Sequence, residues 1–197
     1  MSHLPVVNDS VLNLLAANLN GQRILDLGCG HGTWGFLIRL KKQGRPTMTG
    51  IDVWKPSLAS LRNTGLYDDL ICADACHLPL KSNVFDVVLA SEILEHLPYS
   101  KTTSFFKEID AVCKVRIILT TPKGFSKQHV TENNPYEEHK SGWQQLQLQN
   151  LRFQCRTIQD PNYLPEKLRN LINKLSKVFP PLQYKEIIAW RDRDPKG

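Results

Sequence analysis

Short apolar runs rich in β-branched residues alternate along this chain with longer stretches in which apolar positions recur at helical spacing. This alternation predicts an α/β fold built on a mainly parallel sheet. Three of the runs are almost continuously apolar, as strands are when helices cover both of their faces. The predicted strands are 23–28, 47–53, 69–74, 85–92, 116–122, 153–159 and 186–192, and the first, fourth and fifth of them are the continuous runs.

Helical spacing predicts helices between these strands, near 8–19, 32–42, 56–64, 100–113, 141–149 and 164–179. Ser141 and Gln144 have the spacing of a capping box, so we expect Ser141 to open the fifth helix. The last helix carries an apolar stripe flanked by lysines, which predicts a basic amphipathic insertion over 160–182, before the final strand.

The longest stretch without a clear period, 123–140, is polar and contains Pro135. Loops of that length inside a compact domain are uncommon unless they have a function or lack order. We therefore expect a substrate loop or lid over residues 123–143.

The 197 residues are 41% hydrophobic and 22% charged, a globular balance that excludes disordered and fibrous classes. The length predicts a single domain over residues 1–197. No apolar run approaches the roughly 20 residues that span a bilayer, and the first residues lack the basic and apolar blocks of a secretory signal. The sequence therefore predicts a cytoplasmic protein.

The formal net charge of +6 arises in the second half of the chain. Residues 1–100 contain 8 Lys and Arg against 9 Asp and Glu, whereas residues 101–197 contain 17 against 10. Such asymmetry can mark contact with nucleic acid, anionic lipid or a phosphorylated substrate, and it can equally be a solvated basic face.

The five cysteines are scattered and form no C-x-x-C pair, so we expect no disulfide framework. Cys72, Cys76 and His77 lie close together in the sequence, but a second ligand pair at suitable spacing is missing. The sequence therefore predicts no metal site.

The strongest chemical signal is I-L-D-L-G-C-G-H-G at residues 24–32, where an apolar strand runs directly into a glycine-rich turn and then a helix. Glycines let the backbone turn sharply and approach a ligand closely, and the helix that follows presents free N–H groups. In open α/β sheets ligands bind at the carboxyl ends of the strands, so a cofactor is expected at this turn.

Gly30, Gly32 and Gly35 also spell the G-x-G-x-x-G pattern of dinucleotide enzymes, which is weak evidence alone. Asp26 argues against a dinucleotide, because a carboxylate at the mouth of the turn would repel a pyrophosphate and would suit an ammonium group. This favours S-adenosylmethionine as the ligand. Asp52 and Asp74 end the second and third strands, where they could bind ribose hydroxyls and an adenine amino group.

The chain at this point resembles the class I S-adenosylmethionine-dependent methyltransferases, particularly the small-molecule enzymes that include those of quinone biosynthesis. The resemblance covers roughly residues 20–125 and rests on I-L-D-L-G-C-G-H-G, G-I-D-V, C-A-D-A-C-H-L-P and F-D-V-V-L-A-S-E-I-L-E-H-L. It implies a Rossmann-like, seven-stranded sheet whose last strand is antiparallel, with helices on both faces. It also implies cofactor contacts by Asp26, Gly28, Cys29 and Gly30 at the methionine moiety, Asp52 and Val53 at the ribose, Ala73, Asp74 and Ala75 at the adenine, and Ser91 near the sulfur.

The acceptor side is expected near 123–143, where T-P-K-G and N-P-Y-E-E-H-K-S-G-W resemble a stretch of some bacterial methyltransferases of sugars or secondary metabolites. Asn134, Tyr136 and Trp143 are the candidate substrate-binding residues. If the acceptor is a hydroxyl rather than an amine or an activated carbon, a base must take its proton. His96 and His139 are the candidate catalytic bases, with Glu92 or Glu95 orienting the ring of His96.

Three other readings stay open at this stage. An RNA or DNA methyltransferase would explain the basic second half, but no N-P-P-Y-like motif follows the fourth strand, and Asn134-Pro135-Tyr136 comes one strand later. A lipid or quinone methyltransferase could contact a membrane surface through the basic stretch 164–179. A non-catalytic regulatory partner could bind the cofactor without using it.

Overall fold

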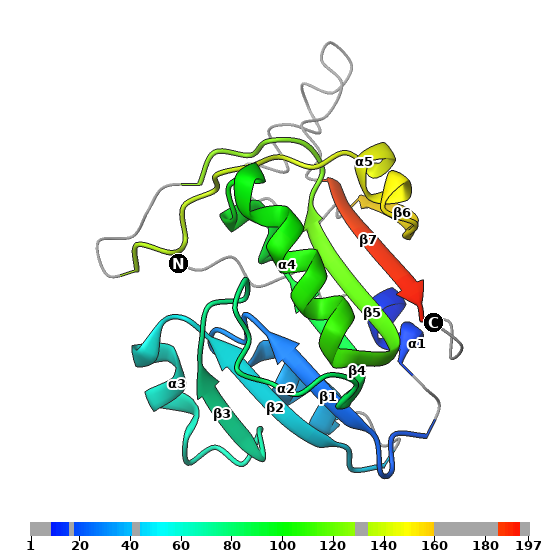
Figure 1. The fold of residues 1–197 in the computed structure, drawn as a ribbon. Coiled ribbons are helices and arrows are strands. Elements are labelled where there is room, and N and C mark those ends of the chain that lie inside the picture. Colours follow the sequence, from blue (N-terminus) through cyan, green and yellow to red (C-terminus); the bar gives the residue numbers. More distant parts are fainter. Residues whose placement is uncertain (1–8, 16–17, 41–43, 129–133, 160–184, 194–197) are drawn as a thin grey trace, which may run out of the picture.

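The computed structural model describes residues 9–15, 18–40, 44–128, 134–159 and 185–193, and a seven-stranded sheet lies at its centre (Figure 1). The strand order is β3-β2-β1-β4-β5-β7-β6. Strand β7 runs antiparallel to both of its neighbours, and the other neighbouring pairs are parallel. The strands are β1 (Arg23–Leu27), β2 (Thr47–Asp52), β3 (Asp69–Cys72), β4 (Phe85–Ser91), β5 (Cys113–Pro122), β6 (Gln154–Gln159) and β7 (Lys185–Asp192). The predicted mainly parallel sheet with an antiparallel last strand is confirmed.

Helices cover both faces of this sheet, as predicted. Helix α4 lies in front of it in Figure 1 and packs Phe105 and Ile109 into one core, while Val11 of α1 and Trp34 of α2 belong to a separate core. The helices are α1 (Asp9–Leu14), α2 (Thr33–Leu40), α3 (Lys55–Leu61), the 3-10 turn η1 (Leu94–His96), α4 (Tyr99–Val112) and α5 (Gln145–Asn150).

Helix α5 begins at Gln145, so the predicted helix near 141–149 starts too early, whereas residues 8, 16–17 and 41–42 of the predicted helices near 8–19 and 32–42 lie outside the described residues. The predicted helix 164–179 and the insertion 160–182 lie outside the described residues. None of the described helices is long and apolar enough to cross a membrane.

Strand β4 shows why its sequence is a continuous apolar run. Val88 and Ala90 contribute to the core beneath α4, whereas Val87 and Leu89 contribute to the core beneath α1 and α2. Because successive side chains of a strand point to opposite faces, a strand buried on both faces needs apolar residues at consecutive positions.

The parallel strands also fix the position of the candidate site. In register, Leu27 of β1 lies beside Ile51 of β2, and Asp52 lies beside Cys72 of β3. The carboxyl ends of these strands therefore meet at one edge of the sheet, where the loops that follow them come together.

The segments 123–128 and 134–143, parts of the predicted substrate loop, are tied to each other and to η1. Lys123 and Gly124 form β-bridges with Trp143. The backbone N–H groups of Lys140 and Ser141 both donate to the carbonyl of Glu95, at 2.8 and 3.0 Å. The loop is thus anchored next to the end of β4.

The predicted capping box at Ser141 is wrong. Ser141 is buried, donates through Oγ to the carbonyl of Leu94 at 3.2 Å, and accepts from the Trp143 indole at 3.0 Å. Helix α5 is instead capped by Gln144, whose backbone N–H donates to the Gln147 side chain at 2.7 Å. The serine hydroxyl makes a tertiary hydrogen bond and does not cap the helix as the local pattern had predicted.

Because the loop is anchored, we expect a larger residue at position 142 to destabilise the protein. An added Cβ there would lie 2.4 Å from the backbone nitrogen of Phe125, so the two loop segments would have to separate. We expect Gly142→Ala to lower the free energy of unfolding by about 1–3 kcal/mol, as overpacking does, and to increase proteolytic cleavage within 123–143. Glu138→Ala, at an exposed position of the same segment, is the control. Equal denaturation midpoints for the two variants would contradict this packing.

Candidate functional site

A cavity of about 650 Å³ lies where β1, β2, β3 and β4 end, within the roughly 300–1,000 Å³ typical of small-molecule sites. Part of its wall comes from the strand ends, and part comes from η1 and the segment 134–140. Most of the predicted site residues line it: Gly28, Cys29, Gly30, Asp52, Val53, Ala73, Asp74, Ala75, Ser91, His96, Asn134, Tyr136 and His139. Asp26 and Trp143 are not among its lining residues.

Asp52, the last residue of β2, joins two of the loops that form this wall. Its Oδ2 accepts from the Gly30 N–H at 2.8 Å, and its Oδ1 accepts from the Trp54 N–H at 2.7 Å. Gly30 has a φ of +48°, in the left-handed region that favours glycine, and an added Cβ would meet nothing closer than the Gly28 carbonyl at 3.9 Å. Burial raises the pKa of Asp52, and the two N–H groups oppose that rise by stabilising the charged carboxylate.

Asp26 lies elsewhere than the sequence predicted. Its side chain is 1% exposed, and its Oδ2 accepts a hydrogen bond from the Tyr67 hydroxyl at 2.5 Å. The prediction that this carboxylate faces the mouth of the glycine-rich turn is wrong, because the Tyr67 hydroxyl binds it inside the protein. Its Oδ1 is buried without a hydrogen-bond partner among the described residues. Tyr67 also accepts from the Gly35 N–H of α2 at 3.2 Å, a link that no sequence motif indicated.

Asp74 lies two residues beyond β3 and is bound from two sides. It accepts from the Cys76 N–H at 2.9 Å, and its other oxygen is 3.2 Å from Nζ of Lys101. Burial alone would raise the pKa of Asp74, but these contacts lower it, so the carboxylate is charged at neutral pH.

The end of β4 combines a hydroxyl chain with an unusual backbone. Thr120 Oγ1 donates to Glu92 at 3.0 Å, so the Ser91 hydroxyl, 2.7 Å from Thr120, must be the donor in their shared hydrogen bond. Glu92 lines the cavity with a φ of +51°, which is uncommon for a residue with a side chain. Such strain is concentrated at functional sites.

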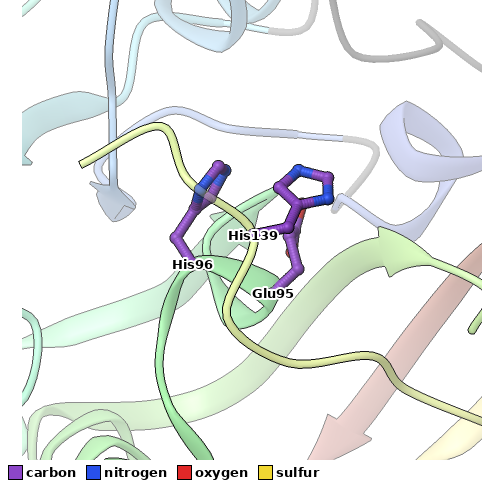
Figure 2. A group of neighbouring side chains, drawn as sticks. All are labelled: Glu95, His96 and His139. Carbon is purple, nitrogen blue, oxygen red and sulfur yellow. The ribbon is translucent and has the colours of Figure 1, made fainter. Parts of the chain in front are cut away.

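His96 and His139 lie next to each other in the cavity wall, with ring centroids 4.8 Å apart and the ring planes at 78° (Figure 2). His96 Nδ1 lies 3.2 Å from the carbonyl of Glu138, and His139 Nδ1 lies 2.6 Å from the carbonyl of Ser126. A backbone carbonyl therefore orients the ring of His96 through Nδ1, and the orienting role of Glu92 or Glu95 stays a prediction. Burial, together with the neighbouring His139, lowers the pKa of His96 to about 4.

Glu95 lines the same part of the cavity and is 1% exposed. Its Oε2 accepts from the Thr121 hydroxyl at 2.9 Å, while Oε1 has no hydrogen-bond partner in the described part of the chain. Burial raises the pKa of Glu95 well above its usual range, and the charge of Glu92 adds to this rise. Together with His96 and His139, Glu95 forms a group of donor atoms that could share a metal ion.

Trp143, predicted to bind substrate, belongs instead to the core. It is 4% exposed and packs against Tyr99 and Phe106, with centroid distances of 5.4 and 6.2 Å. The hydrogen bond from its indole N–H to Ser141 helps to hold the loop in place.

The burial of Asp26 predicts a pH dependence of stability. Burial raises the pKa of Asp26 from 3.8 to about 7, against an opposing hydrogen bond from Tyr67. Between these values the folded protein holds a proton that the unfolded chain has released, so the contribution of this group to the free energy of unfolding falls as pH rises from about 4 to 7. Asp26→Asn should remove that fall in denaturant titrations of the ligand-free protein. Exposed Asp69→Asn should keep it, and parallel curves for wild type and Asp26→Asn would contradict the burial of a carboxyl group here.

Comparison with known proteins adds family information to this geometry. A family model described as a methyltransferase domain matches residues 25–119. The malonyl-[acyl-carrier protein] O-methyltransferase of Buchnera aphidicola is 28% identical over 166 residues, covering 75% of this chain and 62% of that protein. A ubiquinone biosynthesis O-methyltransferase of Bordetella avium is 33% identical over 90 residues, covering 43% of this chain and 36% of that protein. The chain therefore matches less than two thirds of the length of either relative.

A solved structure supports the same assignment at the level of fold. A SAM-dependent methyltransferase from Archaeoglobus fulgidus superposes with a TM-score of 0.63 at 17% identity, covering 94% of this chain and 92% of that one. The matched segment contains most of β1, all of β2 to β4 and most of β5, and it includes the glycine-rich turn, Asp52 and Asp74. The methyltransferase-domain match and the sheet topology are both consistent with a class I S-adenosylmethionine-dependent methyltransferase.

Proposed function

We propose that this chain transfers a methyl group from S-adenosylmethionine to an oxygen atom of a polar small molecule, of the sugar or secondary-metabolite class. The observation that carries the proposal is the continuity of one cavity. In the sheet order β3-β2-β1-β4, one end is lined by Asp74, Asp52 and the glycine-rich turn, at the ends of the first three strands, and the other by His96, which follows β4, with His139 beside it.

The residues at the first end fit a nucleoside with an amino-acid tail. Asp52 and Asp74 offer carboxylate oxygens to hydroxyl and amino donors, and the open side of Gly30 leaves room for a ligand beside the turn. When bound, S-adenosylmethionine supplies a methyl group on a positively charged sulfur.

The residues at the second end fit a polar acceptor. Methyl transfer needs the acceptor atom and the methyl carbon about 3–3.5 Å apart and aligned, so the main task of the protein is positioning. His96 and His139 can donate and accept hydrogen bonds there, and Asn134 and Tyr136 line the same cavity, with the Tyr136 ring 6.2 Å from that of Trp54. The segment 134–143 is anchored to η1, so it can hold an acceptor against the end of β4.

The names of the relatives support oxygen as the accepting atom, since both are O-methyltransferases. The charge distribution gives less support to a nucleic-acid acceptor than the sequence suggested. Several basic residues of the second half form ion pairs with acidic ones, among them Lys101, Lys114, Arg116, Arg191 and Arg193.

Cofactor binding is the first test, by calorimetry with S-adenosylhomocysteine and, separately, NAD. We expect the homocysteine compound to bind and NAD not to bind. Asp52→Ala should weaken binding about 10- to 100-fold, because it removes a charged acceptor and releases Gly30 and Trp54, and hydrogen bonds to charged groups contribute about 1.5–3 kcal/mol. Asp69→Ala is the control, because Asp69 begins β3, at the end of that strand away from the cavity. Tighter binding of NAD would refute the cofactor assignment.

The acceptor end is tested by His139→Ala once an acceptor has been found by screening metabolites for methyl incorporation. Because His139 lies at the acceptor end, we expect turnover to fall about 10²- to 10⁴-fold, whether its Nε2 takes the acceptor proton or holds a group that does so, with unchanged affinity for S-adenosylhomocysteine. An equal loss of turnover and of cofactor affinity would remove His139 from the acceptor side. Transfer of a radiolabelled methyl group from S-adenosylmethionine to RNA, and not to a small molecule, would overturn the proposed acceptor class.

A further inference from the structure

Three side chains from separate parts of the sequence meet at the acceptor end of the cavity. Glu95 and His96 belong to η1, and His139 belongs to the segment that crosses it (Figure 2). One potential ligand atom from each of these residues lies within 4.8 Å of the others. Two imidazoles and a carboxylate are the donor set of many divalent metal sites that keep positions open for water or substrate.

The hydrogen bonds of the histidines prepare both rings for this role. Carbonyl oxygens only accept hydrogen bonds, so Nδ1 of His96 carries its proton toward Glu138, and Nδ1 of His139 carries its proton toward Ser126. In each ring the lone pair is then on Nε2. A ligating histidine typically donates its other ring N–H to a backbone carbonyl or a carboxylate, which fixes the tautomer and the ring orientation.

Glu95 provides an independent indication of a missing ligand. It is 1% exposed and lines the cavity, and its Oε1 has no hydrogen-bond partner among the residues that the structure describes. The ion pairs found in that part of the chain do not include Glu95. An unsatisfied oxygen of a buried carboxylate is costly, and a cation at this position would satisfy it.

We propose that Glu95, His96 and His139 bind one divalent metal ion of the class that accepts mixed nitrogen and oxygen ligands, such as Zn²⁺, Co²⁺ or Mn²⁺. All three residues line the cavity, so positions left open on the ion would be reachable from it. That an acceptor oxygen occupies one of them rests on the proposed function, whereas metal binding itself does not. A bound metal ion would also connect the loop segment 134–143 to η1. This inference departs from the sequence expectation of no metal site, which considered only Cys72, Cys76 and His77.

The test uses the full chain, freed of any affinity tag, stripped with a chelator and titrated with Co²⁺. Calorimetry should give one ion per chain, and the visible spectrum should show Co²⁺ bound to nitrogen and oxygen ligands. Glu95→Gln keeps the volume of the side chain and an acceptor for Thr121, and His139→Gln changes a loop residue. Each should weaken binding at least about 10- to 100-fold, the loss seen when even an outer-shell partner of a ligand is removed.

His77→Ala is the matched control, because it removes an exposed imidazole beside Cys76 and should leave Co²⁺ affinity unchanged. Circular dichroism of each variant verifies folding, and if Glu95→Gln does not fold, His139→Gln decides. Failure of the wild type to bind Co²⁺, unchanged affinity in His139→Gln, or loss of binding in His77→Ala would each overturn the proposal. Titration of the same samples with S-adenosylhomocysteine separates the two ideas: binding of the nucleoside without the metal refutes only this inference, and binding of the metal without the nucleoside refutes only the proposed function.

Discussion

The site depends on the Asp52 carboxylate, whose two oxygens bind the backbone N–H groups of Gly30 and Trp54. These contacts tie the loop after β1 to the loop after β2, next to the edge where the parallel strands end. Burial raises the pKa of Asp52, and the hydrogen bonds from the two N–H groups offset that rise in part. Because the same residue lines the cavity, the group that shapes the turn is also available to a ligand.

Most of the sheet could be predicted because the constraint on it is local. A strand buried on both faces, such as β4, must be apolar at consecutive positions, and that pattern is visible without any knowledge of its neighbours. The prediction failed at Ser141, where the S-x-x-Q spacing describes a helix start. The serine hydroxyl is used instead by the carbonyl of Leu94, 47 residues away in the sequence. Spacing within one segment carries no information about such a contact.

The candidate site was predictable to the extent that strand ends define it. Asp52 ends a strand and Asp74 follows one, so their place on the cavity could be expected, whereas the Asp26 carboxylate is bound inside the protein by Tyr67, which no motif identifies. Trp143 resembled a substrate contact because it lies in a polar loop, but a large aromatic side chain there secures the loop to the core. Likewise, the proximity of His139 to Glu95 and His96 is created only by the return of the chain across η1.

The central claim is that one cavity holds a nucleoside at the strand ends and an acceptor beside the two histidines. A crystal structure of the chain with S-adenosylhomocysteine tests it most directly. The account predicts density for the ribose at Asp52, for the adenine near Asp74, and for the sulfur near Ser91, with the space toward His139 left for an acceptor. Density for the nucleoside beside His96 and His139, or outside this cavity, would contradict it.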